Sequence, residues 1–305
     1  MTTSIWLYAG FTAFILAMLA LDLGVFHREA HVVRAKEAGT WVAVWMAISL
    51  LFAGTLFFWR GTEAALLFLT GYLIEQSLSA DNIFVIVMIF SYFSIPEKYQ
   101  HRVLFWGILG ALVMRGVFIG IGTWLIQKIE WVMYIFGAFL IFTGVRMAVR
   151  GDEKFDAESN PVMRTARRFL RVTSAYDGTR FFTVERGRYA ATPLFLVLLL
   201  VEFTDLVFAV DSIPAIFAVT TDPFLVYTSN VFAILGLRSM YFLLAGIVHR
   251  FDYLKYGLAV ILVFVGLKML VDKFLHVPIL ISLCFIILTI GISIAASLLK
   301  SPKPE

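Results

Sequence analysis

Five carboxylates lie within long apolar stretches of this chain, and their positions set them apart from ordinary surface acids. They are Glu75, Asp81, Glu202, Asp205 and Asp211. An ionisable side chain at the centre of a bilayer costs at least a few kcal/mol even on the mildest scale. Like charges held close together also repel unless protons or cations neutralise them. These acids are therefore expected to form a binding site for a cation.

The acids occur in two related motifs. Residues 75–82 and residues 205–212 both consist of an acid, five residues, an aspartate and a small polar residue. The next apolar segment in each case contains Ile-Leu-Gly and an arginine, Arg115 after the first motif and Arg238 after the second. Because the same signals recur in the same order, the sequence predicts an internal repeat that carries the site twice.

The candidate ligand atoms of both motifs are all oxygens. The predicted metal ligands are Glu75, Asp81, Asn82, Glu202, Asp205, Asp211 and Ser212. Neither motif contains a cysteine or histidine, so the chemistry suits Mg²⁺, Ca²⁺ or Mn²⁺ and argues against Zn²⁺ or Cu⁺. The residues alone do not choose among the three hard cations. Arg115 and Arg238 are expected to balance part of the negative charge, and a purely structural ion-pair network is the alternative.

Helical spacing divides the first motif between two faces. Glu75, Ser79 and Asn82 fall on one face of a helix, at positions i, i+4 and i+7. Asp81 points away from that face. The first motif is therefore expected to place a carboxylate, a hydroxyl and an amide on one face of its helix.

The second motif predicts an irregular helix. Glu202 and Asp205 share a face, whereas Asp211 points to the opposite side of a straight helix at about 100° per residue. Pro214 has no N–H to donate to the carbonyl of Val210, which predicts a kink or unwinding around Val210–Asp211. Freed carbonyls there would add oxygen ligands, as half-helices do in transporters.

Long apolar runs must position these residues. The chain is 61% hydrophobic and 15% charged, and about 20 apolar residues are enough for a helix to cross a bilayer. About nine such runs occur, at roughly 5–25, 41–59, 64–93, 102–126, 130–149, 193–219, 226–248, 254–272 and 278–299. The first is expected to be an ordinary spanning helix, because no basic residue precedes it as in a cleaved signal. The chain is thus predicted to be an all-α polytopic membrane protein.

Each repeat unit is expected to contain three spans, in residues 64–149 and 193–272. A third matching signal, residues 142–147 and 264–269, closes the two units. Because three is odd, the second unit enters the membrane from the other side, which is the inverted-topology architecture of many secondary transporters. The predicted divisions are two peripheral helices (1–60), the first repeat (61–150), a loop (151–192), the second repeat (193–273), and a final helix with its tail (274–305).

Lysine and arginine cluster in alternate connections. The largest of these, residues 151–192, contains a basic amphipathic segment at 163–172 and a possible hairpin at 181–190. Since basic loops remain in the cytoplasm, the N-terminus is expected outside and the C-terminus inside. The loop is expected to be a solvated linker, with a lipid-headgroup or partner contact as the alternative.

Charge and cysteine content exclude two classes of function. The net charge of +4 reports topology and not a nucleic-acid partner, because the basic residues flank the spans. Cys284 is the only cysteine, so neither an intrachain disulfide nor a CxxC redox pair can form.

The paired motifs resemble the signatures of the TerC family. Glu75-x-x-Leu78-Ser79-x-Asp81-Asn82 and Glu202-x-x-Asp205-x5-Asp211-Ser212-Ile213-Pro214-Ala215 carry the resemblance, and residues 68–75, 229–230 and 234–238 are similar to its Alx-like branch. The resemblance covers nearly the whole chain. Members are bacterial inner-membrane proteins, variously called tellurium-resistance proteins, membrane-bound redox modulators and manganese exporters.

The resemblance implies export of Mn²⁺ from the cytoplasm, with the seven predicted ligands at its site. The leading hypothesis is accordingly a secondary transporter, not an enzyme, that exchanges Mn²⁺ for protons and holds no permanent cofactor. Its expected partners are a divalent cation and membrane lipid, without nucleic acid, and the sequence leaves the oligomeric state open. The main alternative is a scaffold or modulator in tellurite or redox stress, or in secretion, that binds partners through residues 151–192.

A third hypothesis, an intramembrane aspartyl protease, also uses buried aspartates. It would require a GxGD element, and neither Asp81 nor Asp211 follows one. The sequence therefore favours transport over proteolysis.

Overall fold

The computed structural model of the chain describes residues 5–21, 35–129, 131–149, 160–173, 175–185, 187–245, 253–272, 274 and 277–299. Over these residues it contains ten helices and one two-stranded hairpin. The elements are α1 (Ile5–Leu21), α2 (Ala35–Arg60), α3 (Thr62–Tyr92), α4 (Glu97–Lys128), α5 (Val132–Val149), α6 (Pro161–Phe169), β1 (Phe182–Glu185), β2 (Arg188–Ala191), α7 (Pro193–Phe217), α8 (Pro223–Leu244), α9 (Leu254–Val271) and α10 (Ile279–Leu299).

Seven of the described helices are long and apolar enough to span a membrane. These are α2, α3, α4, α5, α7, α9 and α10. Helix α1 is apolar but shorter, and α8 has polar residues such as Asn230 and Arg238 that lower its mean hydropathy. The expectation of an all-α polytopic membrane protein is confirmed. The count of nine spans stays a prediction, since it also needs α1 and α8 to cross.

Helix α8 is the most enclosed helix of the bundle. It contacts α2, α3 and α4, and most of its side chains are buried. A helix that is surrounded by protein can carry polar groups at membrane depth, because its neighbours and not lipid receive them. The low hydropathy of α8 is therefore consistent with a central position.

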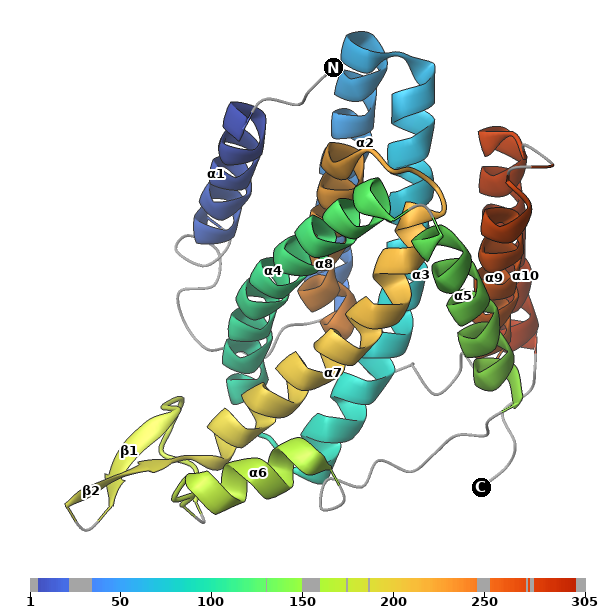
Figure 1. Ribbon diagram of the computed structural model, residues 1–305. Helices are drawn as coiled ribbons and strands as arrows, with labels where there is room; N and C mark the ends of the chain where they lie inside the picture. Colours follow the sequence, from blue (N-terminus) through green and yellow to red (C-terminus); the bar gives the residue numbers. More distant parts are fainter. Residues whose placement is uncertain are drawn as a thin grey trace.

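The hairpin and α6 lie together at one end of the bundle, at the bottom of Figure 1. Helix α3 ends there, and α4 and α7 begin there. We call this the hairpin end. Tyr176 donates a hydrogen bond to the carbonyl of Phe93 (2.7 Å), and Arg102 donates to Thr179 Oγ1 (2.8 Å). Burial raises the pKa of Tyr176, which keeps its hydroxyl protonated as a donor. These two bonds fix residues 176–179 to the end of α3 and the start of α4.

The hairpin predicted around residues 181–190 is confirmed. Strands β1 and β2 pair antiparallel, with Val184 opposite Tyr189 and Glu185 opposite Arg188. Gly187 has φ +75°, a conformation that glycine adopts without the cost of a Cβ. The connection between the two strands therefore includes a glycine in the left-handed region.

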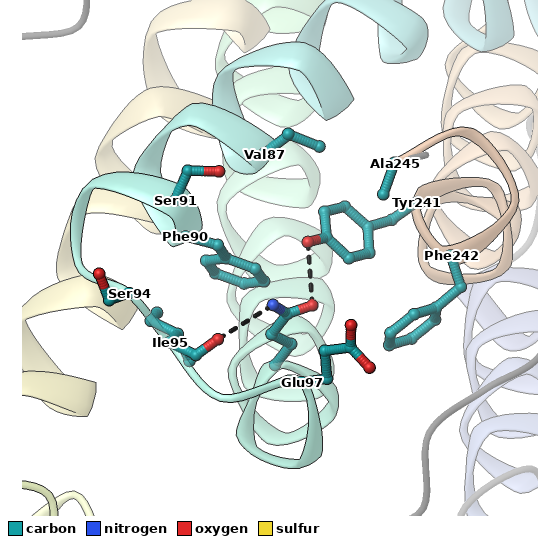
Figure 2. Close-up of a pocket in the computed structure, with 10 residues that line it drawn as sticks. Val87, Phe90, Ser91, Ser94, Ile95, Glu97, Tyr241, Phe242 and Ala245 are labelled. Carbon is teal, nitrogen blue, oxygen red and sulfur yellow. Dashed lines mark hydrogen bonds between the residues drawn. The ribbon is translucent and has the colours of Figure 1, made fainter. Parts of the chain in front are cut away.

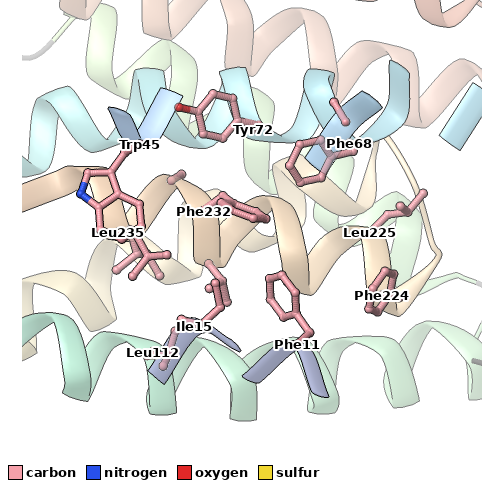
Figure 3. Close-up of a cluster of buried hydrophobic side chains, with 14 of the residues drawn as sticks. Phe11, Ile15, Trp45, Phe68, Tyr72, Leu112, Phe224, Leu225, Phe232 and Leu235 are labelled. Atoms are coloured by element: carbon pink, nitrogen blue, oxygen red, sulfur yellow. The ribbon is translucent and has the colours of Figure 1, made fainter. Parts of the chain in front are cut away.

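An aromatic cluster fastens α1 and α2 to the rest of the bundle (Figure 3). The ring of Phe52 lies 5.1 Å from that of Phe68 and 5.0 Å from that of Phe232, and Phe11 lies 5.6 Å from Phe232. Aromatic pairs at such tilted or edge-to-face geometry contribute about 0.5–1.5 kcal/mol beyond the area they bury. The first two helices are thus packed on α3 and α8 through specific contacts.

The unwinding predicted around Val210–Asp211 is wrong, because α7 is helical from Pro193 to Phe217. Pro214 lies in the last turn, so its missing N–H affects only one carbonyl near the end of the helix. The helical bonding resumes at once, since the amide of Ala218 donates to the carbonyl of Pro214 (3.1 Å). Only the carbonyl of Val210 loses its helical donor, because α7 is not broken there.

Candidate functional site

Four helices meet at Arg115 in the interior of the bundle. Its guanidinium donates to both carboxylate oxygens of Asp205 (3.0 and 3.3 Å) and to Asn230 Oδ1 (2.8 Å). It also forms an ion pair with Glu75 Oε1. These four residues, which we call the Arg115 cluster, come from α3, α4, α7 and α8, and all are buried.

The Arg115 cluster contains more negative than positive charge when its carboxylates are ionised. Glu75 and Asp205 each approach the one guanidinium, whose planar fork suits bidentate contacts with carboxylates. Glu75 Oε2 has no hydrogen-bond partner within the described residues, although it is fully buried. A buried carboxylate oxygen without a partner is costly, so this side of the cluster favours a proton or a second cation.

A small cavity lies beside Asp205, between α3, α4, α7 and α8. Its volume is about 20 Å³, which is the size that holds a single water molecule. The oxygen-bearing side chains in its lining are Asn82, Thr204 and Asp205. Asn82 Oδ1 is buried and has no hydrogen-bond partner in the described part of the chain. This deep cavity therefore offers oxygen ligands from both predicted motifs to one water or one dehydrated ion.

The first motif has the predicted division between faces. Glu75, Ser79 and Asn82 are all buried, whereas Asp81 is half-buried. The three residues predicted to share a face are thus all buried, and Asp81, predicted to point away from them, is more exposed than they are.

The second motif is divided between two neighbouring helices. Asp205 faces Arg115 on α4, whereas Asp211 accepts a hydrogen bond from Thr143 on α5 (3.2 Å). Ser212 is buried, and its hydroxyl has no partner among the described residues. Asp205 and Asp211 thus point from α7 to different neighbouring helices, as their divergent spacing predicts.

Glu202 lies against α4 at a glycine. A Cβ at Gly110 would overlap the carboxylate of Glu202, so only glycine leaves the side chain its present position. Since Glu202 and Asp205 both face α4, their shared helical face is confirmed. Arg238 is buried on α8.

The predicted ligands do not converge on one point in this conformation. Within the residues that the structure describes, no group of three or more His, Cys, Asp or Glu side chains is placed to hold a metal ion. Glu75 and Asp205 meet at Arg115, and Asn82 joins Asp205 at the deep cavity. Glu202 shares the α4-facing side of α7 with Asp205 but lies against Gly110, and Asp211 contacts Thr143 on α5, so the full ligand set stays a prediction.

Two polar contacts of the site were not expected from the motifs. Asn230 accepts from Arg115, and Thr143 donates to Asp211. Asn230 is an amide within an apolar segment, and Thr143 belongs to the third repeated signal at residues 142–147. Both residues were therefore distinguishable in the sequence, but neither is ionisable, as the five acids are.

These features define an integral, multi-pass helical membrane protein with buried, charge-bearing side chains in its centre. The chain belongs to the TerC family: the profile described as "Integral membrane protein TerC family" matches residues 60–305. The relatives below match the chain over nearly its whole length, so the similarity includes part of α1 and α2 as well.

Three relatives indicate how similar this chain is to other members. It is 56% identical over 295 residues to "Uncharacterized membrane protein STKORF319" of Myxococcus xanthus (97% of this chain, 92% of the relative). It is 53% identical over 300 residues to the Salmonella typhi protein named "Putative membrane-bound redox modulator Alx" (94% and 93%). The protein of that name from Escherichia coli K12 is 53% identical over 287 residues (91% and 89%). No solved structure matches the chain.

Proposed function

We propose that this protein is a secondary transporter that exports Mn²⁺ from the cytoplasm in exchange for protons. The observation that carries the proposal is the Arg115 cluster, where two buried carboxylates share one guanidinium beside a cavity with oxygen ligands. A membrane-buried ionisable group is a functional site by default, because its cost must be offset by a role or a partner. The excess of buried negative charge suits a divalent cation or protons.

The packing of α5 on α9 supports the proposed inverted repeat. The signals at residues 142–147 and 264–269 make Gly144 equivalent to Gly266, and therefore Gly137 equivalent to Ala259. Gly137 is in close contact with Gly266, and Gly144 is in close contact with the carbonyl of Ala259. When the two repeats are exchanged, the contact of Gly137 with Gly266 becomes a contact of Ala259 with Gly144, which the structure also contains. This is the behaviour expected of two units related by a two-fold axis in the membrane plane.

In the proposed mechanism, the two repeats supply ligands to one ion and their carboxylates release protons as it binds. Glu75, Asp81 and Asn82 would act from α3, and Glu202, Asp205, Asp211 and Ser212 would act from α7. Because these residues do not converge in the present conformation, the proposal requires α3 and α7 to move relative to each other. Hard oxygen ligands suit Mn²⁺, and the family resemblance favours Mn²⁺ over Ca²⁺ and Mg²⁺.

The orientation is part of the proposal. We infer that the hairpin end faces the bacterial cytoplasm, because residues 151–192 form the most basic connection of the chain. The direction of transport, from that end outwards, follows from the family resemblance.

Mn²⁺ flux into proteoliposomes, with a pH gradient imposed or removed, tests the proposal. We expect flux by the parent protein that depends on the gradient, and loss of flux in Asp81→Asn and Asp211→Asn. Glu63→Gln is the matched control, because Glu63 is an exposed acid at the start of the same helix as Asp81. Elution as a single species on size exclusion establishes that each variant is folded. Parent-like flux in both aspartate variants would contradict the proposal.

A role as a membrane scaffold or modulator is the second candidate. Exposed apolar side chains on one face of the hairpin favour it: Phe182, Val184 and Tyr189 are 50%, 59% and 83% exposed. The names of the Alx relatives also mention a redox role. Replacing residues 161–191 by a flexible linker separates the two candidates. A scaffold would lose its stress phenotype on this replacement and retain it in Asp211→Asn, whereas a transporter would lose it in Asp211→Asn.

A further inference from the structure

We propose that a second cavity, at the hairpin end between α3, α4 and α8, is the vestibule through which a hydrated divalent cation reaches the deep cavity. A layer of side chains about one helical turn thick closes the vestibule from the deep cavity. The identity of the ligand rests on the proposed function, whereas the vestibule and its closing layer rest on geometry alone.

The vestibule has the size and lining that a hydrated cation requires. Its volume is about 500 Å³, and each water of a hydration shell occupies about 30 Å³ of liquid. Glu97, Ser91 and Ser94 are exposed in its lining, and Gln100 and Tyr241 carry the polar groups further in. Figure 2 shows the Glu97 carboxylate and the Tyr241 hydroxyl in the same space. A carboxylate among neutral oxygens attracts a cation without removing its water.

The two cavities lie along the same groove. Each of three helices contributes one residue to the deep cavity and another, four positions away, to the vestibule. The pairs are Ile86 and Phe90 on α3, Leu104 and Gln100 on α4, and Leu237 and Tyr241 on α8. Four helical residues rise about 6 Å, so about one helical turn separates the two spaces along each of these three helices. The deep cavity also reaches Asp205 of the Arg115 cluster.

The layer between them is held closed by a hydrogen bond. The rings of Phe90 and Tyr241 meet edge to face, with centroids 5.4 Å apart, and both residues are buried. Tyr241 donates to Gln100 Oε1 (3.0 Å), and Gln100 Nε2 donates to the carbonyl of Ile95 (3.2 Å). This chain of bonds ties the ring on α8 to the α3–α4 connection, as the dashed lines in Figure 2 mark.

The layer gives the buried acids a barrier on the vestibule side. Ile86, Leu104 and Leu237 are buried behind the two rings, so an ion must lose its water or the rings must turn before it passes. Turning the Tyr241 ring breaks its bond to Gln100 and leaves the ring contact as the main restraint. Loss of the Tyr241 hydroxyl should therefore open the layer more often without removing the packed ring.

Thiol labelling tests the closing layer and needs no metal. The background is the full-length chain with Cys284→Ser, into which Ile86→Cys is introduced, and a hydrophilic maleimide is the probe. We expect slow labelling of Cys at this position, and labelling about fivefold faster when Tyr241→Phe removes a net hydrogen bond of ordinary strength. Phe90→Ala, which deletes a ring of the layer, should accelerate labelling further.

Two control positions keep the result interpretable. Ser94→Cys lies in the open vestibule and should react rapidly with or without Tyr241→Phe. Ile89→Cys is fully buried one residue from Phe90 and should remain unreactive, because general loosening of α3 would expose it as well. Unchanged labelling of Ile86→Cys in both Tyr241→Phe and Phe90→Ala would overturn the closing layer.

A second arm tests the ligand with Mn²⁺ itself as the probe. Mn²⁺ should slow the labelling of Ser94→Cys, and Glu97→Gln should abolish this protection. Labelling of Ser94→Cys that is insensitive to Mn²⁺ would overturn the vestibule as a cation site. Failure of Mn²⁺ flux in proteoliposomes would instead contradict the proposed transport, and the metal-free labelling would still report on the layer.

Discussion

Arg115 balances two carboxylates on two other helices, Glu75 on α3 and Asp205 on α7. The cost of burying these charges is offset by good geometry, since Arg115 makes two bonds to Asp205 and one to Asn230. A buried pair of this kind contributes little net stability over an apolar replacement, but loss of one partner is expensive. The arginine therefore has a structural role that is separable from any role in binding an ion.

Arg115→Met should destabilise the protein by about 3–5 kcal/mol, because Glu75 and Asp205 would lose their shared cation. Thermal unfolding in detergent measures the effect as a lower midpoint. Adding Glu75→Gln and Asp205→Asn to Arg115→Met should restore much of the loss, since no ionised group then remains unpaired. If the protein with Arg115→Met alone were as stable as the parent, this account of the Arg115 cluster would be contradicted.

Gly110→Ala should reduce Mn²⁺ flux with little effect on folding. The added Cβ would overlap the flexible carboxylate of Glu202, which can move aside at a cost of less than about 1 kcal/mol but loses its position. Gly120→Ala is the matched control on the same helix, because no atom of a neighbour lies within 4 Å of its new Cβ. Equal flux in both variants would show that the placement of Glu202 does not matter for transport.

At the scale of the elements, the contact between α5 and α9 depends on glycine. A Cβ at Gly266 would lie 2.7 Å from the carbonyl oxygen of Gly137, and a Cβ at Gly137 would lie 3.0 Å from that of Gly266. The obstructing atoms belong to the backbone, so one helix must move to accept a side chain. This close approach is the reason that two helices with few polar side chains associate firmly in lipid.

Gly266→Ala should therefore destabilise the protein by about 1–3 kcal/mol, the usual cost of overpacking. The higher helix propensity of alanine offsets up to about 1 kcal/mol of this cost. Gly291→Ala on α10 is the control, because its Cβ would meet nothing within 4 Å and should leave stability unchanged or slightly higher. The measurement is again the unfolding midpoint in detergent, and parity between the two variants would contradict the close contact.

At the scale of the whole molecule, the basic connection at residues 151–192 determines which end of the bundle is proposed to face the cytoplasm. The connection between α2 and α3 lies at the end opposite the hairpin (Figure 1). In a Cys284→Ser background, we expect Thr62→Cys to react with an impermeant thiol reagent from outside the cell, because Thr62 is exposed. Arg180→Cys, near the hairpin, should react only in inverted membrane vesicles. Labelling of both positions from one side would refute the proposed topology.

Much of the fold could be predicted from local patterns in the sequence. Runs of about 20 apolar residues determine helices that satisfy their own backbone hydrogen bonds in lipid. The hairpin predicted at residues 181–190 occurs as strands β1 and β2, within one residue of those bounds. Helical spacing also predicted that Glu75 and Asn82 would be buried together and that Asp205 and Asp211 would diverge. The unwinding predicted in α7 does not occur, because Pro214 lies in the last turn and the helix continues past its missing N–H.

The partners of the buried charges depended on the tertiary structure. From the sequence, Arg115 and Arg238 were equivalent candidates for balancing the acids, but the packing of α4 against α3 and α7 gave both Glu75 and Asp205 to Arg115. Asn230 and Thr143 became contacts of the site for the same reason. Helical periodicity determines the direction of a side chain from its own helix, whereas its partner depends on which residues of distant helices face it. The sequence by itself thus determined the membrane class and the list of acids, and only the packing of the helices decided which of them meet.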